Sequence, residues 1–178
     1  MRWLEADLDG ARAAFSTRVG GVSEAPIDSL DLGLLTDDTG EAVAENRRRL
    51  AAALGFPPER IAIARQVHGA GLIAHPHHLP ATPLPCSLAA YDEEKEQRRV
   101  EVPEADGQVV SGPGLAPLVF TADCLPVALS GPGGVAMLHC GWRGLAAGIV
   151  ARGAEAVGAT TAAIGPGIAA CCYEVGPE

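Results

Sequence analysis

The chain has 178 residues, of which 48% are hydrophobic and 4% are aromatic, and its formal net charge is −9. This length allows one domain with a substantial core, and the hydrophobic content excludes wholesale disorder. The scarcity of aromatic residues predicts a core of aliphatic side chains. The acidic balance disfavours non-specific nucleic-acid binding, which needs a basic face, although one or two arginines suffice to bind a small anion.

The sequence also carries information about compartment. The start of the chain has no apolar signal region, and no window approaches the roughly 20 apolar residues of a membrane span. The five cysteines are odd in number and lack the spacing of a disulfide framework. We therefore expect a reduced, cytoplasmic setting and no membrane association.

The first half of the chain predicts a strand, a glycine-rich turn and a loop, over residues 11–17, 18–23 and 24–40. A helix is expected next, beginning with a capping box in which Asp38 precedes Glu41 by three residues. It runs to about Leu54, where Gly55 and the following prolines stop it.

The middle of the chain predicts a strand over 61–68, with alternate residues on opposite faces, and a further short strand over 71–75. Residues 76–104 are expected to form a flexible insertion loop, because prolines near its start are followed by a run of charges.

The second half is rich in short apolar runs separated by glycine or proline, which predicts strands over 107–111, 117–122, 125–130, 134–139 and 160–164. A helix is expected over 145–157. No repeat and no linker between two cores is visible. We therefore predict one α+β domain over residues 1–178, with mixed β-sheets flanked by helices.

Three residues at the ends of predicted strands are the main candidates for chemistry: His68, Cys124 and His139. A thiolate and imidazoles can bind zinc, and they can equally act as a nucleophile and its base. Two histidines and one cysteine without an obvious fourth ligand are typical of an open, catalytic metal site. The alternative interpretation is a small buried thiol and hydrogen-bonded core histidines.

His139 is followed by Cys140 and then by the turn 141–144. His139 and Cys140 cannot face the same side of an extended strand, so one of them points away from the site. The turn opens the predicted helix, and its free N–H groups with Arg143 offer an anion site. Alternatively, Trp142 packs as a lid on the core, and both interpretations can hold together.

The remaining histidines and the last two cysteines receive structural interpretations. His75, His77 and His78 lie among prolines, so we treat metal binding by them as adventitious. The adjacent residues Cys171 and Cys172 have poor geometry for a disulfide or for two ligands of one metal, and we interpret them as structural.

Several motifs occur together in a characteristic order. They are FSTRVGGVS (15–23), SLDLG (29–33), Asn46-Arg47, QVHG (66–69), Ala105-Asp106-Gly107, TADCLPV (121–127), HCGWRG (139–144), IGPGI (164–168) and CYEVG (172–176). With these motifs the chain resembles the YfiH-like, laccase-domain family, whose members are described as purine nucleoside phosphorylases. The resemblance runs from about residue 15 to the end of the chain, and it implies the α+β fold of that family.

The resemblance implies that His68, Cys124 and His139 bind zinc. It implies cleavage of adenosine, inosine or methylthioadenosine by phosphate, which gives the free base and ribose 1-phosphate, and adenosine deaminase activity beside it. The older family name, polyphenol oxidase, implies copper. The sequence disfavours copper, because a multicopper oxidase needs many histidines and this chain has five.

The chain departs from the family pattern in a few places. The family usually has Asn where Asp31 stands and Ala where Cys140 stands, and residues 75–104 are longer than usual. Members usually continue beyond the position of Glu178, so the domain is expected to be C-terminally incomplete.

For the mechanism, we expect the metal to act as a Lewis acid or to lower the pKa of a bound water to about 7. Arg18 and Arg143 are the candidate phosphate ligands, through charge-assisted hydrogen bonds. Asp123 is a candidate for proton transfer to the leaving base, and Gln66 for orienting the purine or ribose.

Two other functions use the same sequence. In a metal-free hydrolase or deamidase, Cys124 would be the nucleophile and His139 its base. In a non-catalytic accessory protein, the domain would bind a nucleoside without turnover. The sequence fixes neither the preferred nucleoside nor the oligomeric state.

Overall fold

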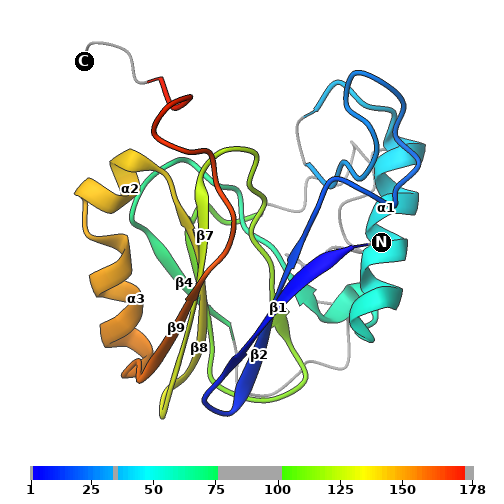
Figure 1. Cartoon of the computed structure of the whole chain (residues 1–178). Helices are drawn as coiled ribbons and strands as arrows, with labels where there is room; N and C mark the ends of the chain where they lie inside the picture. The colour runs from blue at the N-terminus through cyan, green and yellow to red at the C-terminus, as the bar shows by residue number, and fades with distance from the viewer. Residues whose placement is uncertain (1, 34–35, 76–101, 175–178) are drawn as a thin grey trace.

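The computed structural model describes residues 2–33, 36–75 and 102–174, and at its centre lies a five-stranded sheet (Figure 1). The strands follow the order β4-β5-β8-β7-β9, with bounds Leu72–His75, Gly107–Val110, Gly134–Cys140, Leu125–Gly131 and Thr161–Ile164. β4 runs parallel to β5, and every other neighbouring pair is antiparallel. The predicted α+β fold with mixed sheets is confirmed.

One face of the sheet is covered by helix α3 (Ile149–Val157), which follows the short helix α2 (Trp142–Ala146) (Figure 1). The core between them is aliphatic, as the composition predicts, and includes the fully buried Leu138 and Ile149. The single helix predicted over 145–157 is wrong in its bounds. The chain breaks at Gly148, whose φ of 81° lies in the left-handed region that glycine adopts without a steric penalty.

The other face of the sheet carries a β-hairpin of β1 (Trp3–Leu8) and β2 (Ala11–Ser16) (Figure 1). Phe15 packs with Ala13 and Ala128 in a second apolar cluster, with Met137 beside them. β2 is the predicted first strand, whereas β1 was not predicted. Its residues are exposed or only half-buried, so the sequence shows no continuous apolar face there.

Helix α1 (Gly40–Leu54) lies on the far side of the hairpin and matches the predicted helix (Figure 1). Its N-cap is Thr39 rather than Asp38, because the Thr39 side chain accepts the hydrogen bond from the Ala42 N–H. Gly55 ends it in the left-handed conformation, as predicted.

The strands predicted over 61–68 and 117–122 are much shorter in the structure. After the 3-10 turn Pro58–Arg60, β3 (Ile61–Ala62) pairs in parallel with β6 (Ala116–Pro117). The four residues 61–64 are all buried, so the predicted alternation of two faces is wrong. Packing on both sides of this segment, against α1 and against the sheet, overrides the local pattern.

The short strand predicted over 71–75 is confirmed as β4 (Leu72–His75). His75 ends β4, is 4% exposed, and its Nε2 lies 2.9 Å from the Gln108 side-chain oxygen, so it is a hydrogen-bonded core residue. His77, His78 and the predicted insertion up to residue 101 lie outside the described residues. The Arg65 N–H donates to the Pro103 carbonyl, and the Ala105 N–H donates to the Arg65 carbonyl.

Among the described helices, none combines the length and the apolar character that a membrane crossing requires.

Candidate metal centre

Three strand ends meet at one end of the central sheet, and they carry the residues of the candidate centre. Cys124 directly precedes β7, and His139 lies in β8, opposite Pro126 of β7. Asp106 directly precedes β5, and its carbonyl accepts a hydrogen bond from the His139 N–H at 2.7 Å. The antiparallel pairing of β5, β8 and β7 therefore brings Asp106, His139 and Cys124 together at one end of the sheet.

His68, Cys124 and His139 each offer one ligand atom, and these three atoms lie within 4.8 Å of one another. The rings of His68 and His139 meet edge to face, with centroids 4.8 Å apart. A tetrahedral zinc ion with bonds of about 2.0–2.3 Å holds its ligand atoms roughly 3.5 Å apart. His68 is the exposed member of the set, and an adjustment of about 1 Å brings the ligand atoms to this spacing, so the donor set fits zinc.

Asp106 holds the two histidines in place. Its carboxylate is fully buried, and Oδ1 lies 2.8 Å from Nδ1 of His139. The same carboxylate accepts hydrogen bonds from the backbone N–H groups of Val67, His68 and Gly69, at 3.2, 2.9 and 2.7 Å. Because Nδ1 of His139 is engaged, its Nε2 is left for the cluster, which is the usual role of a carboxylate behind a metal-binding histidine.

His68 has a φ of 59° and is the one described non-glycine residue with positive φ. This left-handed conformation is uncommon outside glycine and costs roughly 1–2 kcal/mol. Three backbone N–H groups, those of Val67, His68 and Gly69, donate to the Asp106 carboxylate and hold His68 in this conformation. The strand predicted to continue to residue 68 instead turns here, and the turn directs the imidazole to the cluster.

Two glycines allow close packing around the cluster. A Cβ at Gly141 would lie 3.1 Å from the Cys124 Sγ and 3.2 Å from the His68 ring. A Cβ at Gly144 would lie 2.6 Å from the carbonyl oxygen of Gly69, which is backbone and cannot move aside alone. The turn 141–144 therefore packs directly against the His68 loop.

We expect Gly144→Ala to displace the His68 loop and to weaken metal binding. Overpacking of this kind costs about 1–3 kcal/mol of stability, and a shifted ligand weakens the site further. Zinc affinity measured by competition with a chromophoric chelator should fall. Gly71→Ala is the matched control, because nothing lies within 4 Å of the added methyl group. Equal affinity in the two variants would contradict the packing role of Gly144.

Burial raises the pKa of the half-buried Cys124 thiol; a hydrogen bond with Tyr173 acts in the opposite direction, and Asp123 and Asp106 raise the pKa further. The free thiol is therefore protonated near neutral pH. Because thiolate is the form that binds metal, binding must release this proton.

We expect zinc affinity to rise with pH while Cys124 remains protonated in the free protein. One released proton predicts a gain of about tenfold per pH unit over roughly pH 7 to 8. Zinc titrations in buffers of increasing pH measure this slope. A flat profile over that interval would mean that the Cys124 thiol is not a ligand.

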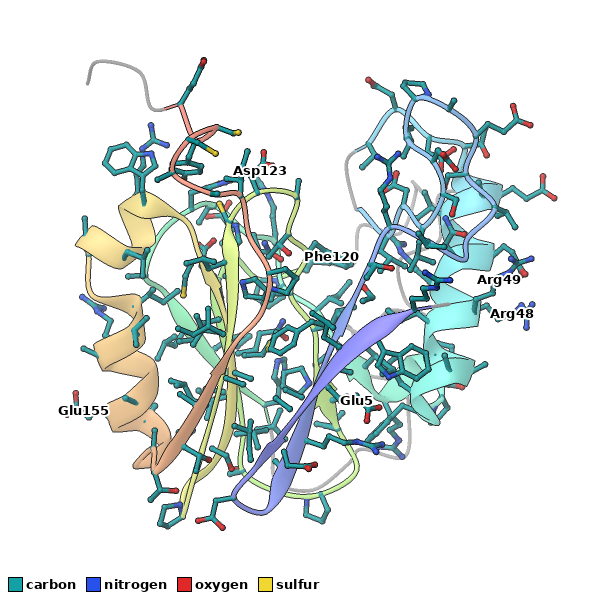
Figure 2. The ribbon with its side chains drawn as sticks, in the orientation of Figure 1. Glu5, Arg48, Arg49, Phe120, Asp123 and Glu155 are labelled. Atoms are coloured by element: carbon teal, nitrogen blue, oxygen red, sulfur yellow. The ribbon has the colours of Figure 1, made fainter. Side chains whose placement is uncertain are left out.

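The other predicted site residues lie at different places. Asp123 is exposed beside Cys124 at the end of the sheet (Figure 2). Arg143 lies over the Trp142 ring, 4.6 Å from its centroid. Trp142 is 38% exposed, so its interpretation as a lid on the core is wrong. The start of α2 has no side-chain cap.

Gln66 and Arg18 make structural contacts. The Gln66 amide donates to the Phe120 carbonyl and accepts from the Phe120 N–H, both at 2.7 Å. Arg18 donates from Nε to the Asp28 carbonyl, on the segment between β2 and α1, across the molecule from α2 and α3 (Figure 1). Substrate contacts by Gln66 and phosphate contacts by Arg18 stay predictions.

The departures from the family pattern also have places in the structure. Cys140 is 2% exposed and packs in the core beneath α3, while His139 faces the cluster, so the two adjacent residues separate as expected. Burial raises the pKa of Cys140 to about 11, with smaller effects from Cys124 and Asp106. Asp31 accepts a hydrogen bond from the Gly33 N–H at 2.9 Å.

Sequence reasoning missed two residues of the centre. Asp106 belongs to the motif Ala105-Asp106-Gly107. A carboxylate next to an apolar strand is a signal that the carboxylate is buried with a partner. Tyr173 reaches Cys124 from the segment after β9, and the sequence carries no signal for that contact. Both residues act on the ligands rather than as ligands.

An α+β fold that gathers two imidazoles and one thiol at one end of a mixed sheet defines a protein with a candidate transition-metal centre. Comparison with known proteins gives the family. Residues 12–178 match the model of the family described as multi-copper polyphenol oxidoreductase laccase, and the chain belongs to this family. The resemblance to YfiH-like proteins is thereby confirmed.

Curated relatives carry the name purine nucleoside phosphorylase. A protein of that name from Pseudomonas aeruginosa is 37% identical over an alignment of 185 positions, which covers 99% of this chain and 66% of the relative. The protein YlmD of Geobacillus stearothermophilus, with the same name, is 36% identical over 176 residues, covering 93% of this chain and 60% of the relative.

Solved structures agree with these relatives. The YfiH protein of Bacillus licheniformis superposes with a TM-score of 0.76 at 29% identity, covering 91% of this chain and 60% of the other. A Neisseria meningitidis protein superposes with a TM-score of 0.73 at 30% identity, covering 98% of this chain and 66% of the other. The chain thus spans slightly under two thirds of the length of several of the proteins it matches.

Proposed function

We propose that the protein is a zinc-dependent purine nucleoside phosphorylase, which converts a purine nucleoside and phosphate to the base and ribose 1-phosphate. The observation that carries the proposal is the convergence of His68, Cys124 and His139, supported from behind by the buried Asp106. The names of the relatives support the reaction class. Adenosine deamination is a second reaction proposed for the same centre, and the cytoplasm is the proposed compartment.

Zinc is preferred to copper on the chemistry of the donors. One thiolate and two imidazoles with room for an exogenous ligand are typical of a catalytic zinc site. A multicopper oxidase would need a further histidine-rich cluster, and the described residues offer one group of metal-binding side chains, which is this one. When bound, zinc supplies Lewis-acid chemistry at the open position.

The side chains around the centre have the following proposed roles. Arg143 binds the phosphate by charge-assisted hydrogen bonds, and Gln66 orients the purine or ribose. Arg18 is the other proposed phosphate ligand, and it lies across the molecule from α2, on the segment between β2 and α1. Asp123, exposed beside Cys124, transfers a proton to the base that leaves. The proposed substrates are therefore a purine nucleoside and phosphate, and no nucleic acid or membrane partner is proposed.

A second candidate function is favoured by one specific observation. Asp106, His139 and Cys124 form a chain in which a buried carboxylate orients an imidazole that faces a thiol. A cysteine hydrolase or deamidase has the same order of groups. This function leaves His68 without a role, although its strained backbone is held in place by Asp106. We therefore prefer the metal centre.

Zinc quantification together with product analysis separates these functions. The chain is incubated with adenosine or inosine, with and without phosphate, before and after treatment with a chelator. We expect stoichiometric zinc, and base plus ribose 1-phosphate only when phosphate and zinc are both present. The same assay on a version extended to the full length of the relatives shows whether the additional segment is needed for turnover.

Each alternative has its own result. Turnover without zinc that is blocked by alkylation of Cys124 would support the cysteine hydrolase. Nucleoside binding without turnover, in both the chain and its extended version, would support an accessory protein. Either result contradicts the zinc-dependent phosphorylase.

A further inference from the structure

Two adjacent cysteines lie in an exposed turn after β9. Cys171 and Cys172 are both exposed, and their Sγ atoms are 3.2 Å apart in a thiol–thiol hydrogen bond. The Cys172 N–H donates to the Ala169 carbonyl at 2.9 Å, which closes the turn. Neighbouring side chains of an extended chain point to opposite sides, whereas this turn brings both sulfurs together. Both side chains are exposed and therefore lie outside the buried core.

The same segment caps the candidate metal centre. It leaves the sheet at the end of β9 and rises over the start of β7, as the red trace in Figure 1 shows. The Ile168 N–H donates to the Asp123 carbonyl at 2.9 Å, and Tyr173 hydrogen-bonds the Cys124 thiol. Tyr173 directly follows Cys172, so a change of backbone at the cysteine pair moves the group that contacts Cys124.

We propose that Cys171 and Cys172 form a redox-active dithiol, a modification site that a low-molecular-weight disulfide oxidises to a disulfide between the two adjacent residues. Closing this small ring displaces Tyr173 from Cys124 and weakens metal binding. The ring closure goes beyond the proposed function, whereas its effect on the metal rests on the proposed zinc centre.

The reaction balances by thiol–disulfide exchange. The thiolate of one cysteine attacks a sulfur of the small disulfide, whose S–S bond breaks and releases one small thiol. The second cysteine then attacks the protein sulfur of this mixed disulfide and releases the second small thiol. Two protein thiols are oxidised, one disulfide is reduced, and the two protons leave with the released thiols.

The geometry favours a fast second attack and a ring that is easily reduced. The thiols are already in contact, so the second attack is intramolecular and fast. The Cα atoms of adjacent residues are about 3.8 Å apart, less than the usual disulfide spacing of about 4.4–6.8 Å, so the closed ring is strained and readily reduced. Cys140 is buried and therefore protected from the same reagent.

The first test is the covalent product of the whole chain treated with oxidised glutathione. We expect peptide mapping to place a bond between Cys171 and Cys172, with the mass of that peptide lower by two hydrogen atoms and no glutathione retained on either residue. In Cys171→Ser the second attack is lost, so a stable glutathione adduct on Cys172 is expected. A persistent adduct at Cys171 or Cys172 of the unaltered chain, or no reaction at either cysteine, overturns the proposal.

The second test measures zinc affinity by chelator competition, before and after oxidation. We expect about a tenfold loss on oxidation, because removing a partner of a ligand costs about 10–100-fold. Tyr173→Phe should show this loss when reduced and little further change when oxidised. The double variant Cys171→Ser/Cys172→Ser should not respond to the oxidant.

The two halves of the proposal fail separately. Unchanged zinc affinity in the oxidised chain overturns the coupling while the ring closure stands on its mass. Absence of zinc binding in the reduced chain overturns the coupling together with the proposed zinc centre. The ring closure is still tested separately, by the mass of the peptide that carries Cys171 and Cys172.

Discussion

Replacing Cys124 with alanine is expected to abolish stoichiometric zinc binding and, with it, phosphorolysis of the nucleoside. The variant removes one of three converging ligand atoms, and the remaining imidazoles of His68 and His139 hold the ion weakly. Loss of an outer-shell partner alone costs about 10–100-fold in affinity, so we expect a loss of more than about 100-fold for a ligand. Elemental analysis of dialysed protein and chelator competition measure it.

Cys140→Ala is the matched control for this experiment. It removes a thiol next to His139, but that thiol packs in the core beneath α3 and faces away from the cluster. We expect a modest loss of stability, on the order of 1 kcal/mol, and unchanged zinc stoichiometry. Full zinc binding in Cys124→Ala would refute the metal centre, and zinc loss in Cys140→Ala would reassign the thiol ligand.

Asp106→Asn is expected to lower both the stability of the fold and the affinity for zinc. The carboxylate accepts from His139 and from three consecutive N–H groups, and an amide in its place offers fewer acceptors. A buried donor left without a partner costs about 1–3 kcal/mol, so the free energy of unfolding should fall by about 3 kcal/mol. Denaturant unfolding measures this value, and chelator competition should show a loss of about 10–100-fold.

Glu104→Gln is the control, because it removes a carboxylate two residues away on the same segment. Glu104 pairs with Arg65 at 3.1 Å, but both side chains are largely exposed, and such pairs contribute little. We expect stability and zinc affinity close to those of the unaltered chain. If Asp106→Asn behaved like Glu104→Gln, Asp106 would not position the histidines.

Residues whose environment is local were predictable. Helix α1 carries its own start and stop signals in Thr39 and Gly55, although the capping-box pattern predicts the N-cap one position too early, at Asp38. β7 and β8 are neighbours joined by a short turn, and their pairing places His139 opposite Pro126, next to Cys124. The short separation of Cys124 and His139 in the sequence therefore predicts that the two residues lie close together.

Residues whose partners lie far along the chain were not predictable in the same way. The strand expected over 61–68 ends early because its residues pack on both sides, and His68 turns because a carboxylate 38 residues away binds its N–H. Tyr173 reaches Cys124 from beyond β9. These contacts involve backbone groups or single side chains, and neither produces a periodic pattern.

The sequence by itself determined which three side chains can bind a metal, because their chemistry and the motifs around them are local properties. Only the tertiary structure decided how they are held. Asp106 faces inward between His139 and the His68 loop because two separate segments, the 67–69 loop and β8, supply its donors, and hydrogen-bond partners of a buried carboxylate must be assembled by packing. The same packing places the exposed cysteine pair one residue from the contact between Tyr173 and Cys124.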